Sequence, residues 1–272
     1  MGKIVLITGA SSGIGRSTAL MLLDKGYTVY GAARRVERMA DIENDNFHAL
    51  QMDVTDKATM ISGVKRIIDE QGRIDVLVNN AGYGSYGAIE DVELSEAKYQ
   101  FDVNVFGLAR MTQLVIPHMR AQKSGRIINI TSMGGIIYAP LGGWYHATKF
   151  ALEGFSDCLR FETKQFGIDV VIVEPGAIKT EWDEIAIENM LKTSGESAYA
   201  ELTQKTAEMM RKTYQNKHVS HPDVIAKTIL KAINARKPKT RYAAGHRAKL
   251  FIFLRRLFSD RIYDFILRKN LK

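Results

Sequence analysis

The sequence has few of the residues that build disulfide-bonded or metal-binding folds. It contains one cysteine, Cys158, and six histidines among 272 residues. A lone thiol forms neither an intramolecular disulfide nor a thiolate metal cluster, so we predict no metal site and a protein suited to the reducing cytoplasm. Proline is scarce as well, at five residues. Because proline and glycine do not gather into a linker, we predict a single domain over residues 1–272.

Long apolar stretches are also missing. No window holds about 18 uninterrupted apolar residues, so the sequence predicts no membrane-spanning helix. A strand-like run already begins at residue 4 and leaves no room for the apolar segment of a signal peptide. These absences again favour a cytoplasmic protein.

Positive charge exceeds negative charge, but the excess is concentrated at one end. The net charge is +8, and residues 246–272 hold eight Lys or Arg against two Asp, a local net charge of +6. The rest of the chain is nearly neutral. This distribution argues against a nucleic-acid partner, because a protein that binds nucleic acid needs a basic groove across its fold.

Short apolar runs alternate with longer helical patterns. The strand candidates are residues 4–7, 28–32, 47–52, 76–79, 126–131 and 170–174, with a weaker one at 240–243. This alternation predicts an α/β fold, a doubly wound (Rossmann) parallel sheet of about seven strands with helices on both faces. Residues 181–218 are helical and polar and follow the sixth strand, so we predict a substrate lid there. Residues 246–272 predict a basic amphipathic C-terminal helix.

A glycine-rich segment directly follows the first strand candidate. Gly9 permits a sharp turn, Gly13 allows the backbone to approach a phosphate, and Gly15 allows the next helix to pack closely on the sheet. A strand, a tight turn and an exposed helix N-terminus form a pyrophosphate site, so this segment predicts dinucleotide binding. The residues predicted to contact the cofactor here are Gly9, Ser11, Ser12, Gly13, Ile14 and Gly15.

A phenol and an ammonium group lie four residues apart, at Tyr145 and Lys149. If this segment is helical, both side chains lie on one face. A nearby cation lowers the pKa of a tyrosine, so we expect Tyr145 to exchange protons near neutral pH. Ser132 follows the strand candidate 126–131, at the sheet edge where open α/β folds bind ligands.

Taken together, these residues resemble the short-chain dehydrogenase/reductase family. The resemblance is strong over residues 3–180 and rests on motifs in the family's order and approximate spacing. They are Thr8-Gly9-Ala10-Ser11-Ser12-Gly13-Ile14-Gly15, Asp53-Val54, Asn79-Asn80-Ala81-Gly82, Asn104, Ser132, Tyr145-x-x-x-Lys149 and Pro175-Gly176. Residues 80–87 resemble the branch that contains hydroxysteroid and retinol dehydrogenases.

The resemblance implies an oxidoreductase that interconverts a carbonyl and a secondary alcohol with a nicotinamide cofactor. Tyr145 would be the general acid/base, and Lys149 would lower its pKa and bind the nicotinamide ribose. Ser132 would hold the carbonyl oxygen. Asn104 would hold a water that relays protons to Lys149. The family also suggests a homodimer or homotetramer.

The resemblance also assigns cofactor contacts beyond the glycine loop. Asp53 would bind the adenine, and residues 80–82 would line the adenosine ribose. Singly, Asp53 could instead be a turn residue ahead of the next helix. The predicted cofactor-binding residues outside the glycine loop are Arg34, Arg35, Asp53, Val54, Asn80, Ala81, Gly82, Tyr145, Lys149, Pro175, Gly176, Ile178 and Thr180.

The end of the second strand candidate favours NADP(H) over NAD. NAD enzymes normally place an acidic residue there to bind the ribose 2′-hydroxyl. Here Arg34 and Arg35 stand at that place, and the first carboxylate after the strand candidate is that of Glu37. Two guanidinium groups can bind a 2′-phosphate. The alternative is that both arginines only begin a solvated helix.

The substrate is less well defined by the sequence. Residues flanking the predicted catalytic positions are mostly apolar or aromatic, which predicts a lipophilic ketone or alcohol such as a steroid, retinoid or lipid. They are Tyr83, Tyr86, Met133, Ile136, Tyr138, Pro140, Leu141 and Trp144. The C-terminal segment could pack over the pocket or on a partner subunit, lie on an anionic membrane surface as a peripheral contact, or dock an acidic carrier. A different class of function, an inactive dinucleotide sensor or scaffold of this fold, is the alternative to an enzyme.

Overall fold

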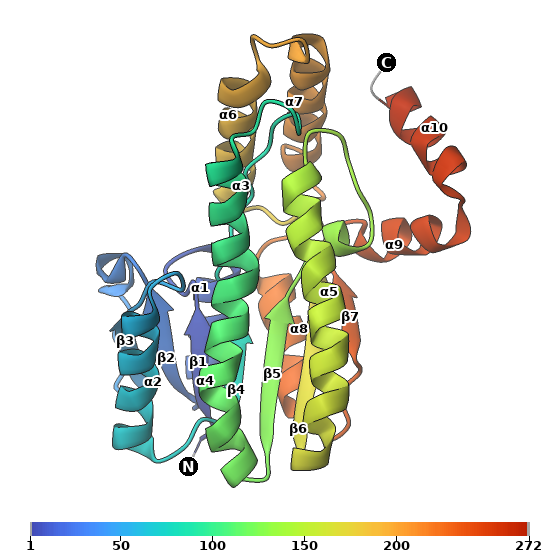
Figure 1. Ribbon diagram of the computed structural model, residues 1–272. Coiled ribbons are helices and arrows are strands. Elements are labelled where there is room, and N and C mark those ends of the chain that lie inside the picture. Colours follow the sequence, from blue (N-terminus) through green and yellow to red (C-terminus); the bar gives the residue numbers. More distant parts are fainter. Residues whose placement is uncertain (1, 271–272) are drawn as a thin grey trace.

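The computed structural model describes residues 2–270 and is built on one seven-stranded sheet (Figure 1). The strand order is β3-β2-β1-β4-β5-β6-β7, and all six neighbouring pairs are parallel. The strands are β1 (Ile4–Thr8), β2 (Thr28–Ala33), β3 (Phe47–Gln51), β4 (Val76–Asn79), β5 (Gly125–Ile130), β6 (Ile168–Pro175) and β7 (Arg241–Ala244). The predicted doubly wound Rossmann fold is confirmed, and every strand candidate lies within two residues of an observed strand.

Helices cover both faces of this sheet. The α-helices are α1 (Gly13–Asp24), α2 (Lys57–Gln71), α3 (Leu94–Phe101), α4 (Leu108–Ala121), α5 (Gly143–Thr163), α6 (Trp182–Ser194), α7 (Ala200–Tyr214), α8 (Asp223–Asn234), α9 (Ala248–Leu257) and α10 (Asp260–Asn270). Short 3-10 turns lie at η1 (Val36–Met39), η3 (Met133–Gly135) and η4 (Lys164–Phe166), and a π-helical segment, η2 (Asp102–Gly107), joins α3 to α4. The segment predicted as a lid forms the α6–α7 hairpin, which stands above the sheet edge (Figure 1).

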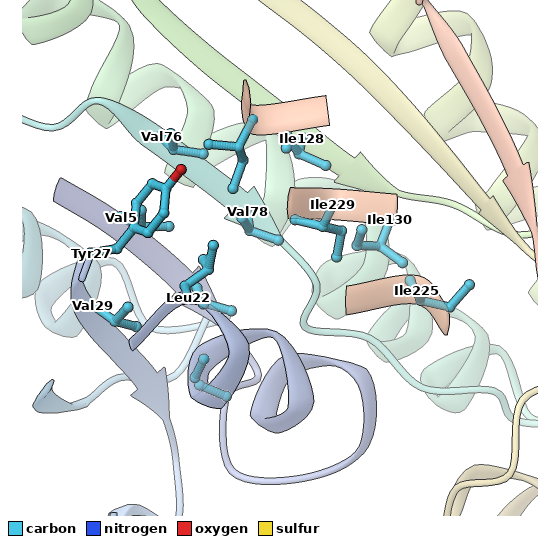
Figure 2. Packing of buried hydrophobic residues seen from close by; sticks show 14 of the residues in the cluster. Val5, Leu22, Tyr27, Val29, Val76, Val78, Ile128, Ile130, Ile225 and Ile229 are labelled. Carbon is cyan, nitrogen blue, oxygen red and sulfur yellow. The ribbon is translucent and has the colours of Figure 1, made fainter. Parts of the chain in front are cut away.

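The alternating side chains of the central strands supply two cores, one on each face. On one face α1 and α8 pack against the strands, and Figure 2 shows Leu22, Ile225 and Ile229 meeting Val78 and Ile130. On the other face Met111 of α4 and Leu159 of α5 pack with α2. Because both faces are covered, the strands read as continuous apolar runs in the sequence.

A buried polar network crosses the second face. Asn79 Nδ2, at the end of β4, donates to Asn129 Oδ1 of β5 at 2.9 Å and to Thr112 Oγ1 of α4 at 3.1 Å. Asn129 Nδ2 in turn donates to Ser156 Oγ of α5 at 2.9 Å. Buried amides need such partners, so this network fixes the register of β4, β5 and the two helices that cover them.

The C-terminal segment differs from the prediction of one helix over residues 246–272. The structure has two helices, α9 and α10, because Phe258 takes an extended conformation (φ −95°, ψ 141°) and the Ser259 carbonyl accepts from Tyr263 N at the start of α10. Residues 271 and 272 of the predicted helix lie outside the described residues. In residues 2–270, no helix is both long and apolar enough to span a membrane.

The Arg126 guanidinium joins three elements at the opposite edge of the sheet. Its Nη1 lies 2.6 to 3.0 Å from the carbonyl oxygens of Ala232, Ile233 and Ala235 at the end of α8, and its Nη2 donates to Asp169 Oδ2 at 2.9 Å. A cation at a helix C-terminus satisfies carbonyls that lack helical partners.

We therefore expect Arg126→Ala to lower the free energy of unfolding by about 1–3 kcal/mol, because it removes the side-chain donor of the Ala232 and Ala235 carbonyls and one of the two cations that contact Asp169, the other being Lys164. The control is Arg66→Ala, which removes an exposed i,i+4 pair with Glu70 and is expected to cost below about 0.5 kcal/mol. Urea denaturation measures both. Equal losses in the two variants would contradict the assignment.

Candidate active site

A crevice of 420 Å³ opens at the carboxyl edge of the sheet, beside the β1–β4 junction where the strand order reverses. Open α/β sheets bind ligands at this place. The predicted site residues that line it are Gly9, Ser11, Ser12, Gly13, Ile14, Arg34, Arg35, Asp53, Val54, Asn80, Ala81, Gly82, Ser132, Tyr145, Lys149, Pro175, Gly176, Ile178 and Thr180. Gly15 and Asn104 are the two predicted site residues that do not line the crevice, because each lies behind the residues that form its wall.

The glycine loop and the start of α1 form a cradle for an anion. Gly9 has φ +68°, and a Cβ there would lie 2.9 Å from the Ala81 Cα. A Cβ on Gly15 would lie 2.2 Å from the Gly9 carbonyl oxygen, so α1 can approach the turn only with glycine at that position. The Ser12 side chain makes no capping hydrogen bond, and the first turn of α1 carries no acidic residue. Backbone N–H groups therefore remain for a pyrophosphate, and the cradle fits one.

The end of β4 is fastened to this loop. Thr8 Oγ1 accepts from Asn80 N and Ala81 N, each at 3.0 Å, and Asn80 Nδ2 donates to the carbonyl oxygens of Thr8 and Gly9 at 3.0 and 3.1 Å. The Asn80 side chain is thus engaged in holding the turn. It shapes the predicted adenosine site through the position of the backbone.

The predicted adenosine end combines a turn with two exposed guanidinium groups. Asp53 Oδ1 accepts from Thr55 N at 2.9 Å, so Asp53 forms the turn that was the alternative to adenine binding and also lines the crevice. Arg34 and Arg35 are exposed and line the same end, and Arg34 Nη1 donates to the Tyr99 hydroxyl at 3.1 Å. Among the residues that the structure describes, Asp53 is the one acidic residue in the lining.

The helix α5 brings the predicted proton-transfer groups to the middle of the crevice. Tyr145 and Lys149 are one turn apart and buried, and the Lys149 Nζ lies 5.9 Å from the centre of the Tyr145 ring. Lys149 Nζ donates to the Ile130 carbonyl oxygen, at the end of β5, at 3.1 Å. The Ser132 hydroxyl, just beyond β5, lies close enough to the Tyr145 phenol to lower the pKa of that phenol. The structure thus gathers Ser132, Tyr145 and Lys149 as the sequence predicts.

Asn104 lies in the π-helical segment η2, behind the crevice wall. Its Oδ1 accepts from Tyr83 N at 3.0 Å, and its Nδ2 donates to the Tyr83 carbonyl oxygen at 2.9 Å and to Thr148 Oγ1 at 3.1 Å. A π-turn inside a helix often marks a functional site. The helix is disrupted at the predicted residue, which joins the loop after β4 to α5.

The expected low pKa of Tyr145 is not found in this structure. Burial raises the pKa of the Tyr145 phenol to about 12, and the nearby Ser132 hydroxyl opposes this shift. Burial also lowers the pKa of Lys149 to about 8. The reason is that desolvation disfavours the charged form of both groups. The phenol is therefore held in its protonated form, which can donate to a carbonyl oxygen.

A cluster of buried and half-buried charges that the sequence analysis did not identify lies behind Lys149. Glu153, one further turn along α5, accepts from Arg241 Nε of β7 at 3.0 Å, while Arg241 Nη2 donates to Asp157 at 2.7 Å. Glu174 of β6 lies 3.7 Å from the same guanidinium. Burial, and then the charge of Glu153, raises the pKa of Glu174 to about 7. The negative charge of Glu153 favours the ammonium form of Lys149. The i,i+4 spacing from Lys149 to Glu153 is the feature of the sequence that could have identified Glu153.

The substrate end of the crevice differs in part from the prediction. Tyr83, Tyr86 and Met133 line it. Ile136, Tyr138, Pro140, Leu141 and Trp144 do not; Tyr138 bonds to Asp264 of α10, and Leu141 packs beneath the α6–α7 hairpin. Residues missed by the sequence analysis take their place.

Trp182 and Tyr214 are the main residues that were missed, and both come from the α6–α7 hairpin. The rings of Trp182 and Tyr86 lie 5.2 and 5.6 Å from the Tyr145 ring. An aromatic enclosure therefore surrounds the phenol. Its position depends on how the hairpin packs, which local sequence does not specify.

His146 has a structural role in this wall. Its Nε2 accepts from Ala139 N at 3.0 Å, so the proton is on Nδ1, which donates to the Gly134 carbonyl oxygen at 2.9 Å. Burial lowers the pKa of His146, which keeps this neutral tautomer. The residue holds the loop between η3 and α5 in place.

We expect Glu153→Gln to lower the pKa of Lys149 below about 8, because the variant removes the negative charge that opposes the desolvation of the ammonium group. The ammonium group then loses its proton at lower pH. Asp157→Asn is the matched control, since Asp157 contacts Arg241 but not Lys149. Nuclear magnetic resonance of the lysine Nζ groups during a pH titration measures the shift. An unchanged Lys149 titration in Glu153→Gln would contradict this electrostatic role.

Comparison with known proteins supports the geometry. The model of the short chain dehydrogenase family matches residues 3–190. The chain is 38% identical over 245 residues to the 3-ketodihydrosphingosine reductase of Bacteroides thetaiotaomicron, covering 89% of this chain and 88% of that protein. It is 33% identical over 284 residues to the NADPH-dependent 3-dehydrocapnine reductase of Ornithobacterium rhinotracheale, covering 99% and 98%.

Solved structures agree with these relatives. A short-chain dehydrogenase from Streptomyces avermitilis superposes with a TM-score of 0.83 at 35% identity, covering 98% of this chain and 96% of that chain. A serine dehydrogenase complexed with NADP+ gives a TM-score of 0.78 at 27% identity, covering 89% and 94%. A 3-ketoacyl-(acyl-carrier-protein) reductase from Brucella melitensis complexed with NADH gives 0.75 at 27% identity, covering 89% and 96%.

The two complexes hold different nucleotides of one class, so the comparisons support a pyridine nucleotide as the cofactor of this fold. The cradle at α1, the crevice at the strand ends and the Ser132, Tyr145 and Lys149 group agree with that class. From its sequence and its fold, this chain belongs to the short-chain dehydrogenase/reductase family of oxidoreductases.

Proposed function

We propose that the protein interconverts a carbonyl and a secondary alcohol on a lipophilic substrate, using NADP(H). The observation that carries the proposal is that one crevice contains both the anion cradle of the glycine loop and the buried Tyr145 phenol with the half-buried Ser132 hydroxyl beside it. A nucleotide held by the cradle and a reacting carbonyl near the phenol would then share one enclosed space.

The chain's own residues would bind the substrate and move the proton. Ser132 and Tyr145 would donate hydrogen bonds to the carbonyl oxygen, and Tyr145, protonated at neutral pH, would give up its proton as negative charge develops there. The bound nicotinamide supplies the hydride. Lys149, charged at neutral pH because its pKa is about 8, would stabilise the phenolate that remains. Asn104 would hold the water through which the proton is replaced.

Charge at the adenosine end supports the choice of NADP(H). Arg34 and Arg35 are exposed there, and neither forms an ion pair with any residue in the described range 2–270. Exposed guanidinium groups that have no ion-pair partner favour a 2′-phosphate over an uncharged hydroxyl group. The name of the Ornithobacterium relative, which includes NADPH, supports the same cofactor.

The character of the substrate end supports a lipophilic substrate. Tyr86, Trp182 and Tyr214 surround the phenol, and Ile137 and Met133 continue the wall. Such walls bind apolar groups and orient them through few polar contacts. One relative is named for 3-ketodihydrosphingosine, the ketone of a sphingoid lipid. We extend that substrate class, a ketone on a lipid chain, to this protein. The α6–α7 hairpin would act as the lid over it.

We further propose a homodimer or homotetramer that works in the cytoplasm and makes peripheral contact with a membrane. The oligomer rests on the resemblance to the family. The membrane contact rests on the basic, amphipathic C-terminal helices.

Arg34→Asp tests the cofactor. We expect the Kd for NADPH to rise about 10- to 100-fold, because a charge-assisted hydrogen bond to the phosphate is replaced by repulsion. The Kd for NADH should stay the same or fall. Arg236→Asp, an exposed arginine outside the crevice, is the control. Fluorescence titration measures both, and equal affinities of the unmodified protein for NADPH and NADH would contradict the choice of NADP(H).

Tyr145→Phe tests the chemistry. With a panel of hydrophobic ketones and alcohols, we expect kcat to fall about 10²- to 10⁴-fold because the proton donor is lost, while the Kd for NADPH changes little. Nicotinamide absorbance reports turnover. Undiminished turnover in the variant would rule out the phenol as the acid. Nucleotide binding without turnover of any compound by the unmodified protein would favour the sensor or scaffold.

A further inference from the structure

Each of the two C-terminal helices turns apolar side chains away from the protein. On α9, Leu250, Phe253 and Leu257 are 51%, 61% and 63% exposed and lie at i, i+3 and i+7. On the opposite side of α9, Ala248 and Ile252 are buried against the body. On α10, Ile262 and Phe265 are exposed while Tyr263 is buried. A surface helix of a globular protein normally has the reverse arrangement, with its apolar stripe facing the core.

Cations surround these apolar side chains. Arg247, Lys249, Arg256, Arg261, Arg268 and Lys269 are exposed, and none of them forms an ion pair within residues 2–270. The two acidic residues of this region are both engaged. Asp260 pairs with Arg255 at 2.6 Å, and Asp264 accepts from the Tyr138 hydroxyl at 2.8 Å. The outward surface of the two helices is therefore apolar and uniformly cationic.

The helices are fixed to the wall of the crevice. Tyr138 follows Ile137, which lines the crevice, and its ring packs 5.0 Å from that of Tyr263, with the Arg255 guanidinium 5.4 and 5.5 Å from the two ring centres. At the other end, Gly176 of the crevice lies directly against the backbone that leads into α9. Figure 1 shows α10 standing beside the loop that leads into α5. A ligand held by α9 and α10 would thus lie next to the substrate end.

We propose that α9 and α10 form a docking surface for an anionic lipid bilayer, into which Leu250, Phe253, Leu257, Ile262 and Phe265 insert. The proposal deepens the proposed function and rests on it for the lipophilic substrate, which this surface brings from the lipid phase to the crevice. Apolar side chains flanked by Lys and Arg are the pattern of helices that lie in the membrane interface. The cations would face the negative surface potential of such a membrane.

Charge argues against a second copy of the chain on this surface. A symmetric pair would bring the same patch of each copy together, so six uncompensated cations would face six others. Anionic lipid compensates them instead. The absence of a spanning helix among the described residues is consistent with contact at the surface of the bilayer.

Sedimentation of the full chain with vesicles tests the surface. We expect binding to phosphatidylglycerol vesicles but not to phosphatidylcholine vesicles, and loss of binding at high salt. The double variants Phe253→Ser/Phe265→Ser and Arg261→Gln/Arg268→Gln should each bind phosphatidylglycerol at least about tenfold more weakly. Matched controls are Phe161→Ser, which removes an 87% exposed phenyl group from α5, and Arg236→Gln/Lys237→Gln, which removes two exposed cations from the loop before β7. Both controls should bind normally.

Turnover separates this inference from the proposed function. With a ketone dissolved in phosphatidylglycerol vesicles, Phe253→Ser/Phe265→Ser should lose about tenfold in rate, in line with its weaker binding. With a water-soluble ketone it should match the unmodified protein. Two results would overturn the docking surface: no sedimentation of the unmodified chain, or full sedimentation of both tail variants. A tail variant with a changed oligomeric state and unchanged vesicle binding would also overturn it in favour of a second copy. Vesicle binding without turnover of any ketone would support the surface and contradict the proposed function.

Discussion

The parallel alignment of seven strands is the constraint on which the site depends. It brings the ends of β1, β2, β4, β5 and β6 to one edge, so that Gly9, Asn80, Ser132 and Pro175, distant in sequence, share one crevice. The hydrogen bond between Asn79 and Asn129 fixes β4 against β5 in the core below that edge. A slip in this register would leave buried amides without partners and would move Ser132 relative to Asn80. The geometry of the crevice therefore follows from the packing of the sheet.

Burial determines the protonation states of Tyr145 and Lys149 at this edge of the sheet. Tyr145 and Lys149 lie in a wall closed by Tyr86 and Trp182, and desolvation moves both groups toward their neutral forms. For Lys149, the charge of Glu153 opposes this effect. Arg241 stabilises that carboxylate and lies between Asp157 and Glu174. The charge available at the centre of the crevice thus depends on residues from α5, β6 and β7 that do not touch it.

Local patterns predicted those parts that depend on local chemistry. The apolar runs indicated the strands, the glycine spacing indicated the turn into α1, and the i,i+4 spacing placed Tyr145 and Lys149 together. Other features depend on tertiary packing, which a single sequence does not specify. Trp182 reaches the crevice only because the α6–α7 hairpin folds back over Tyr86. The raised pKa of Tyr145 follows from the same enclosure. The break at Phe258 depends on how the Tyr138 and Tyr263 rings fix α10 against the body.

In the proposed reaction, a nicotinamide bound in this crevice exchanges hydride with a carbon atom whose oxygen receives a proton from Tyr145. Transfer of an isotope tests it most directly. The protein is incubated with a lipophilic ketone and with NADPH that carries deuterium at both hydrogen positions of C4 of the nicotinamide ring. The alcohol that forms is examined by mass spectrometry. We expect an alcohol heavier by one deuterium on the former carbonyl carbon. Alcohol formed without deuterium, from cofactor labelled at both C4 positions, would contradict it.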